Sequence, residues 1–253
     1  MLEEQIKFWM SKRRSIFEAR VLDCVDSTNT VLAQLARGGA PEFTAVIAGA
    51  QTAGRGRGDH RFFSPAGCGV YFSLLLRPRF SPETAARLIT PASAVAAARS
   101  IERVSGGTAG IKWVNDVFVR GRKACGILTE AAPDENGGLA WVIPGIGINV
   151  QPPPGGYPSE IESVAGAVFQ DCAPEDAAAR LAVEILDELI ELYRAMPAQD
   201  FYEEYAERMI LTGKRITLHG GVQGIVKGVD GCFRLLVHCD DGRELTVDSG
   251  EVY

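Results

Sequence analysis

The 253-residue chain is long enough for one large domain, or for one domain and a small module. Its hydrophobic content of 46% and charged content of 23% are ordinary for a folded globular protein and exclude extensive disorder. The net charge of −6 and the isoelectric point near 5.2 disfavour a protein that grips nucleic acid through its phosphates.

Sequence features that report on location point to the cell interior. The six cysteines are scattered and none forms a CxxC pair, which disfavours a zinc site or a thioredoxin-like motif. In a chain of this length their scatter indicates reduced thiols rather than a disulfide scaffold. The first 20 residues place acids before a basic cluster, unlike a secretory signal peptide. No stretch reaches the roughly 18 apolar residues of a spanning helix, so we expect a cytoplasmic protein with no membrane partner.

Helices and strands are expected to alternate through the first part of the chain. Ser27 and Thr28 precede a segment typical of a helix that stops at Gly38, because hydroxyl side chains cap helix starts and glycine ends helices. Ser81 followed by Pro82 opens a second helix in a similar way. The expected elements are a helical extension over 1–20, a strand from 21, a helix over 28–37, strands over 43–51 and 70–78, and a helix over 81–106.

Four strand-like segments joined by hairpin-like turns come next. These turns indicate a largely antiparallel or mixed sheet rather than a doubly wound parallel one. The segments cover 111–116, 117–121, 123–131 and 139–150.

The sequence pattern of the C-terminal part changes from one typical of a helix to one typical of short strands. Apolar residues at 181, 185, 189 and 192 form a stripe typical of a helix that faces a core. From 211 the chain reads as four short strands with glycine or aspartate turns, typical of a small β-barrel. We therefore predict an α+β fold, a mixed sheet flanked by helices, with an N-terminal extension (1–20), a main domain (21–208) and a C-terminal module (209–253).

Residues 51–61 (QTAGRGRGDHR) place arginines between glycines in a chain that is acidic as a whole. Glycine lets the backbone come close to a ligand, and arginine offers planar donors matched to carboxylates and phosphates. The pattern predicts a mobile loop that wraps an anion. It lacks the P-loop signature and the dinucleotide fingerprint, and a solvated surface loop is the alternative.

Three other segments carry groups that suit a polar ligand. The segment 26–29 (DSTN) offers hydroxyl and amide groups at a helix start, although such residues more often cap the helix. Lys112 and Lys123 would return to one region if the residues between them form a strand and a turn, and a bound anion would relieve their repulsion. Two unrelated surface lysines are the alternative. Gly145 and Gly147 leave room for a flat ligand on one face of a strand, or permit tight strand packing.

Taken together, these segments resemble the biotin protein ligase family, also called biotin–[acetyl-CoA-carboxylase] ligases. The resemblance rests on their order and spacing, and beyond them the C-terminal module resembles the family's SH3-like domain. The resemblance implies that the main domain has a class II synthetase-like fold, that of the biotin ligase catalytic domain. The residues that carry it are DSTN (26–29), QTAGRGR (51–57), FFSPAG (62–67), KWVND (112–116), RKACGILTE (122–130) and GIGINV (145–150).

In that family the enzyme activates the carboxylate of biotin with ATP and Mg²⁺, giving biotinyl-5′-AMP and diphosphate. It then passes the acyl group to a lysine of a biotin carboxyl carrier protein. The resemblance implies catalytic roles for Arg55, Arg57, Lys112, Asp116 and Lys123. It implies biotin contacts by Ser27, Thr28, Asn29, Gln51, Arg55, Gly56, Arg57, Lys123, Gly126, Leu128 and Gly145. It implies nucleotide contacts by Arg57, Phe62, Lys112, Asn115 and Asn149, and no metal held by the protein alone.

The chain departs from the family pattern at Asp59, His60 and Phe62, where members commonly carry glycine, arginine and tryptophan. Phe62 can still cover a ring by stacking. The first 20 residues leave no room for the winged-helix domain of some members, so no DNA partner is expected, whereas a homodimer is possible. The alternatives are a lipoate- or octanoate-transferring relative and a ligand-binding regulator. The glycine–arginine loop and the C-terminal module favour biotin.

Two hypotheses about mechanism accompany the resemblance. Asp116 would orient the acceptor amine or help remove its proton, since a lysine near its reference pKa is mostly protonated at neutral pH. The glycine–arginine loop would close over the acyl-adenylate and exclude the water that hydrolyses it. Because biotin's own carboxylate attacks, no protein nucleophile is needed.

Overall fold

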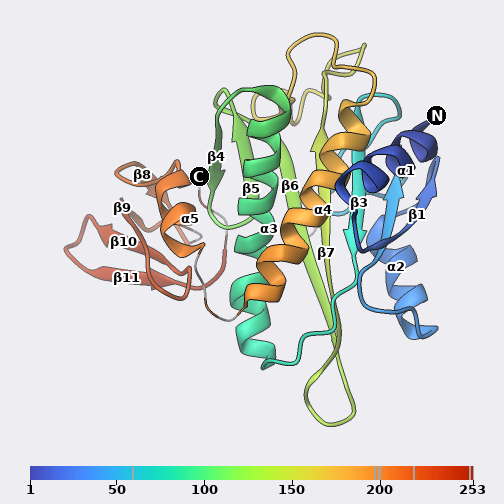
Figure 1. Ribbon diagram of the computed structural model, residues 1–253. Helices are drawn as coiled ribbons and strands as arrows, with labels where there is room; N and C mark the ends of the chain where they lie inside the picture. Colours follow the sequence, from blue (N-terminus) through green and yellow to red (C-terminus); the bar gives the residue numbers. More distant parts are fainter. Residues whose placement is uncertain (59, 197, 199–200, 219, 251, 253) are drawn as a thin grey trace.

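The computed structural model describes residues 1–58, 60–196, 198, 201–218, 220–250 and 252. Within these ranges the strands form a seven-stranded mixed sheet and a four-stranded antiparallel sheet, arranged as in Figure 1. The helices are α1 (Leu2–Arg13), α2 (Thr28–Arg37), α3 (Pro82–Ser105), α4 (Ala177–Ala195) and α5 (Tyr202–Arg208). The strands are β1 (Glu18–Leu22), β2 (Thr44–Ala48), β3 (Gly69–Leu74), β4 (Ala109–Lys112), β5 (Asp116–Val119), β6 (Arg122–Pro133), β7 (Leu139–Asn149), β8 (Arg215–Thr217), β9 (Gln223–Val229), β10 (Leu235–Cys239) and β11 (Glu244–Val247).

The large sheet has the strand order β1-β2-β3-β7-β6-β5-β4. Its first two strands pair in parallel and all its other neighbours pair antiparallel, which confirms the predicted mixed sheet. Consecutive hairpins bring β4, β5, β6 and β7 side by side. This pairing places Lys112 on β4 and Lys123 on β6, the two strands that flank β5.

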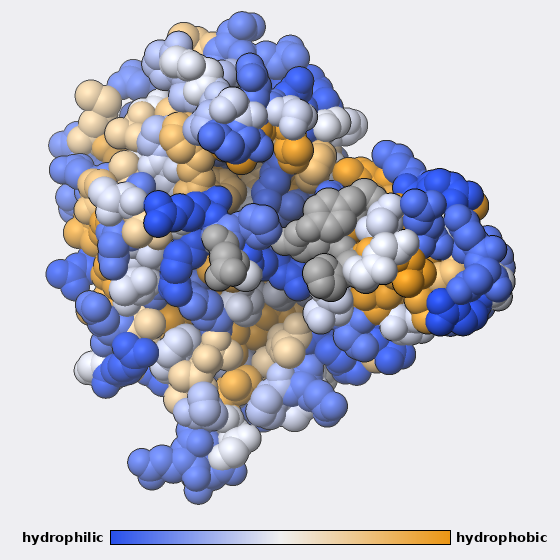
Figure 2. Space-filling model, turned by 180° about the vertical axis from the view of Figure 1, so that it is seen from behind, coloured by the Kyte–Doolittle hydropathy of each residue, from blue (hydrophilic) through white to orange (hydrophobic). Residues whose placement is uncertain are grey.

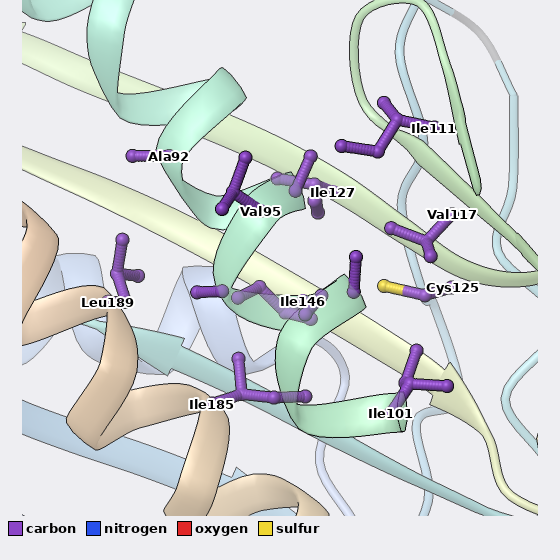
Figure 3. Packing of buried hydrophobic residues seen from close by; sticks show 14 of the residues in the cluster. Ala92, Val95, Ile101, Ile111, Val117, Cys125, Ile127, Ile146, Ile185 and Leu189 are labelled. Atoms are coloured by element: carbon purple, nitrogen blue, oxygen red, sulfur yellow. The ribbon is translucent and has the colours of Figure 1, made fainter. Parts of the chain in front are cut away.

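One face of the large sheet packs on α3 and α4, which lie in front of the strands in Figure 1. Figure 3 shows Ile127 of β6 and Ile146 of β7 beneath Val95 of α3 and Ile185 of α4. Side chains alternate along a strand, so the residues between these apolar ones project from the opposite face. There α2 covers a smaller apolar cluster that includes Leu32.

Helix α3 begins and ends for the predicted reasons, and α4 buries the predicted stripe. The hydroxyl of Ser81 accepts a hydrogen bond from the backbone N–H of Thr84 at 3.2 Å, and α3 ends at Gly106, whose φ of 71° suits glycine. The predicted stripe of α4 is buried in the main core. The short helix α5 was not predicted, because its sequence YEEYAER is charged and spans too few residues to show a periodic pattern.

The N-terminal segment is joined to the main core. Ile6 of α1 is fully buried, and the indole N–H of Trp9 donates to Asp176, just before α4, at 3.2 Å. Strand β1 begins at Glu18, inside the range predicted for the extension. The proposed domain limits at 20 and 208 stay a prediction.

The four strands after residue 211 were predicted and form the small antiparallel sheet, in the order β11-β10-β9-β8. This fold agrees with the predicted SH3-like module. In Figure 2, viewed from the side away from α3 and α4, the module stands out from the body at the right. No helix in the described part of the chain has both the length and the apolar character needed to cross a membrane.

Candidate active site

A cavity of about 420 Å³ lies on the large sheet, and every residue predicted for the site contributes to its lining. The face away from α3 and α4 carries mainly glycine, with one leucine and one asparagine, on adjacent strands. On β6 and β7 these are Gly126, Leu128, Gly145, Gly147 and Asn149, which alternate with buried residues. The cavity is completed by the start of α2, by the glycine–arginine loop and by the segment around residue 161.

The start of α2 is held by Gln51 rather than by a capping serine. The backbone N–H of Thr28 donates to Gln51 Oε1 at 2.9 Å, and the Thr28 hydroxyl donates to the same oxygen at 3.3 Å. The Ser27 side chain forms no capping hydrogen bond. Ser27 therefore occupies the predicted N-cap position, but its buried hydroxyl borders the cavity instead of capping the helix.

Asn29, on the first turn of α2, is the centre of a buried polar network. Its Oδ1 accepts from the Ser73 hydroxyl at 2.6 Å. Its Nδ2 donates to Glu130 Oε2 at 2.7 Å and to the Leu128 carbonyl at 3.2 Å. Neither Ser73 nor Glu130 was predicted, although strand alternation places Glu130 on the same face as Leu128.

The glycines of the sheet make room for side chains of the chain itself. A Cβ at Gly145 would lie 2.1 Å from Asn29 Oδ1. Cβ atoms at Gly126 and Gly147 would lie 2.8 Å and 2.6 Å from the Phe62 ring. The sequence analysis offered room for a flat ligand or tight strand packing as reasons for these glycines. The structure modifies both interpretations, because the strands accommodate an aromatic ring and an amide beside the cavity.

The glycine–arginine loop forms a small hairpin against the site. The backbone N–H of Phe62 donates to the Gly54 carbonyl at 3.0 Å, and that of Gly56 donates to the His60 carbonyl at 2.7 Å. Arg57 donates to Asn115 Oδ1 at 3.3 Å. Gly54 is buried but most of the described loop residues are exposed, so the segment lies at the surface while Arg57 and the backbone at Gly54 attach it to the site. Asp59, one of the departures from the family pattern, lies outside the described residues.

Lys123 and Arg55 each have an anionic partner at the site. Lys123 Nζ lies 2.8 Å from Asp116 Oδ1. Both residues lie on paired strands, where a bulge in the β5–β6 pairing precedes the Phe118–Lys123 pair. Arg55 pairs with Glu130 at 2.6 Å. The predicted repulsion between Lys112 and Lys123 is thus relieved in part by the protein's own Asp116, which is paired in register with Lys112. Within the described ranges Lys112 forms no ion pair.

Residues after β7 close the other side of the cavity. The Lys123 backbone N–H donates to the Val164 carbonyl at 2.9 Å, which ties this segment to β6. Asn149 Nδ2 donates to the Gly166 carbonyl at 2.9 Å, which leaves its oxygen for a ligand. Phe63 and Val164 are 38% and 48% exposed at the cavity, an apolar rim that no sequence pattern indicated.

The described residues contain no group of three or more His, Cys, Asp or Glu placed to hold a metal ion. Asp116 and Glu130 already pair with cations. A Mg²⁺ ion at this site would therefore take its ligands mainly from nucleotide phosphates. The predicted absence of a metal held by the protein alone stays a prediction.

Comparison with known proteins places the chain in a family. Residues 21–149 match the model of the biotin/lipoate A/B protein ligase family. The bifunctional ligase/repressor BirA of Bacillus subtilis is 35% identical over 226 residues, which cover 87% of this chain and 69% of that protein. The biotin–[acetyl-CoA-carboxylase] ligase of Mycobacterium tuberculosis is 31% identical, over 92% of this chain and 88% of its own length.

Solved structures give the same result. The biotin protein ligase from Aquifex aeolicus in complex with biotin and ATP superposes with a TM-score of 0.76 at 25% identity. The match covers 94% of this chain and 98% of that one. The chain belongs to the biotin/lipoate A/B protein ligase family and, within it, to the biotin protein ligases.

Proposed function

We infer that the protein activates biotin with ATP to form biotinyl-5′-AMP and diphosphate, and then transfers biotin to a lysine of a biotin carboxyl carrier protein. One observation carries this conclusion. All the residues assigned to biotin, nucleotide and chemistry from the sequence line a single cavity, in a chain of the biotin protein ligase family.

The site suits a reaction between two anions. Adenylation brings a carboxylate to a polyphosphate, so positive charge must offset their repulsion and the charge that develops on the departing diphosphate. Lys112, Lys123 and Arg57 lie at this cavity. Donors positioned in this way typically contribute about 3–4 kcal/mol each to transition-state stabilisation. We assign Lys123 to the biotin carboxylate, and Lys112 and Arg57 to the phosphates of MgATP.

The two ends of the cavity suit the two substrates. Ser27 and Thr28 supply buried hydroxyl groups and Gln51 a partly buried amide at the start of α2, which match the polar ureido ring of biotin. Asn29, Gly56, Gly126, Leu128 and Gly145 would complete that pocket. On the nucleotide side we place Phe62, Asn115 and Asn149.

We propose that Asp116 acts in the second step. Its carboxylate holds Lys123 at 2.8 Å, so it can turn to the incoming amine once Lys123 engages the acyl-adenylate. In the variant Asp116→Asn, transfer from preformed biotinyl-5′-AMP should slow while the adenylate still binds. Unchanged transfer would exclude this role.

Closure of the loop over the adenylate stays part of the proposal. Arg57 contacts Asn115 and Arg55 contacts Glu130, so the loop has two points of attachment across the cavity. Water exclusion during the reaction predicts stronger protection of residues 52–61 from proteolysis with biotin and MgATP than without them. A homodimer and the absence of DNA binding remain predictions.

The direct test is incubation with biotin, MgATP and a biotin carboxyl carrier domain. We expect AMP release and one biotinyl group on one carrier lysine, located by mass spectrometry. A parallel reaction with lipoate and a lipoyl carrier domain distinguishes biotin ligation from the main alternative, because a lipoate ligase would modify the lipoyl carrier domain instead. Lipoylation without biotinylation would contradict the proposed function.

A further inference from the structure

Glu130 of β6 is a carboxylate beside the site to which neither the sequence motifs nor the chemistry assigns a role. It is not among the described residues that line the cavity. Its Oε2 accepts two hydrogen bonds, one from Asn29 Nδ2 at 2.7 Å and one from Arg55 Nη2 at 2.6 Å. A single oxygen therefore joins the start of α2 to the glycine–arginine loop.

The two donors differ in how firmly they are held. Asn29 is 4% exposed and is fixed further by Ser73 and by the Leu128 carbonyl. The Arg55 side chain is 45% exposed and belongs to a hairpin that carries glycine at 54, 56 and 58. Glu130 is thus bound on one side to the firmly held Asn29. On the other side it binds Arg55, whose glycine-rich backbone is free to move.

The pair also changes which charges face the ligand. With its guanidinium on Glu130, Arg55 adds no net positive charge to the site, unlike Lys112, which forms no ion pair within the described ranges. The charge of Arg55 is therefore used to hold the loop at the α2 end of the cavity. This is a different task from offsetting phosphate charge.

We propose that Glu130 is a positioning residue, which seats the glycine–arginine loop through Arg55 and so shapes the pocket for biotin rather than the chemistry of adenylation. This role rests on the proposed function in that biotin occupies the α2 end. Loss of Glu130 should then weaken biotin binding and loosen the loop, with little change in kcat.

The test compares Glu130→Ala and Glu130→Gln with wild type, and uses Glu135→Gln, an exposed carboxylate of the β6–β7 hairpin, as the matched control. Glu130→Gln keeps the size of the side chain, so it guards against misfolding. The first measurement is hydrogen exchange of residues 52–61 without biotin or ATP. For a partly exposed charged pair we expect exchange to rise about three- to tenfold.

The second measurement is the steady-state kinetics of biotinylation. We expect the KM for biotin to rise by a similar factor while kcat stays within about twofold. In the Arg55→Ala variant, adding Glu130→Ala should cause no further rise in the KM for biotin, because the two residues act through one contact. Loop exchange and KM equal to those of Glu135→Gln, or additive effects of the two alanines, would overturn the proposal.

Hydrogen exchange without ligands separates this proposal from the proposed function. If the wild-type protein transferred no biotin while the Glu130 variants still loosened the loop, the function would fail and the seating of the loop would stand. If the wild-type protein transferred biotin but the Glu130 variants left loop exchange unchanged, the proposed function would stand and the seating of the loop by Glu130 would fail.

Discussion

At the scale of single residues, alternation along two strands builds the site. Residues of β6 and β7 that face α3 and α4 are apolar, as Ile127 and Ile146 show. Their neighbours Gly126 and Gly147 admit the Phe62 ring on the other face. The same two strands therefore supply the core on one face and the floor of the cavity on the other.

Lys123 should be essential for the rate of the chemical step. Its ammonium group is held at 2.8 Å by Asp116 at the cavity, so it is positioned before substrates arrive. We expect Lys123→Ala to lower kcat by about 10²–10³-fold, the loss typical of a preorganised electrostatic donor. Single-turnover formation of biotinyl-5′-AMP measures it. Lys227→Ala, which changes an exposed lysine of β9, should match wild type.

Gly145 should be sensitive to the addition of one methyl group. A Cβ there would lie 2.1 Å from Asn29 Oδ1, and Asn29 is fixed by several hydrogen bonds. We expect Gly145→Ala to lower the free energy of unfolding by about 1–3 kcal/mol and to raise the KM for biotin. Gly155→Ala is the control, since a Cβ there meets nothing within 4 Å. Equal behaviour of the two variants in urea denaturation would argue against this packing.

At the scale of elements, charged side chains connect α3, α4 and α5. Arg99 of α3 bonds Glu188 of α4 and Glu204 of α5, and Arg103 bonds Glu184 and Glu188. Glu184 and Glu188 are buried. Buried carboxylates need such partners, so this network fixes how the three helices pack against one another.

The network predicts a loss of stability in acid. Burial raises the pKa of Glu188, but hydrogen bonds from Arg99 and Arg103 lower it more, so the pKa ends below its ordinary value of 4.5. The pKa of Glu204 is lowered in the same manner. Carboxylates with a lowered folded-state pKa stabilise the fold above the unfolded-state pKa, and this contribution is lost as the pH falls through the folded-state pKa. Asp187, whose pKa burial raises, opposes this effect.

We therefore expect the free energy of unfolding to decrease as the pH falls from about 5 to about 3. Urea denaturation at several pH values measures this dependence. The variant Glu188→Gln cannot titrate at this position and should show a shallower dependence than wild type. An identical dependence in both proteins would exclude Glu188 as a contributor.

The sequence was informative for elements with strong local signals and weak for contacts between distant segments. The start of α3 at Ser81 and the hairpins of the sheet follow from local chemistry and were predicted. The pairing of Glu130 with Arg55 joins residues 75 positions apart, and no local pattern encodes it. Local reasoning included Ser27 among the candidate N-caps, which is its position, but it did not indicate that Gln51, 23 residues beyond Thr28, satisfies the Thr28 N–H.

At the scale of the whole molecule, the C-terminal module contacts the site, since Gly250 and Val252 line the cavity. A buried hydrogen bond adds a second connection. The indole N–H of Trp113 donates to the Phe233 carbonyl at 2.7 Å, and the Phe233 ring packs on Phe201 and Tyr205. Trp113 lies between Lys112 and Asp116 in the sequence and lines the cavity. The module can therefore influence catalysis through this residue.

Removal of this hydrogen bond should affect both stability and rate. We expect Trp113→Phe to lower the free energy of unfolding by about 1–3 kcal/mol, because the Phe233 carbonyl loses its buried partner. It should also lower kcat, since Lys112 directly precedes the altered residue and Asp116 lies three positions after it. Trp141→Phe changes a tryptophan that is similarly buried, in the other apolar cluster. That variant should lose stability without loss of kcat, and an equal loss in both would contradict the coupling.

The central claim is that this cavity activates the carboxylate of biotin by adenylation, and the most direct measurement is exchange of labelled diphosphate into ATP without a carrier protein. We predict exchange that depends on biotin and falls by about 10²-fold or more in Lys123→Ala. Exchange supported by lipoate or octanoate but not by biotin, or no exchange with any of these acids, would contradict it.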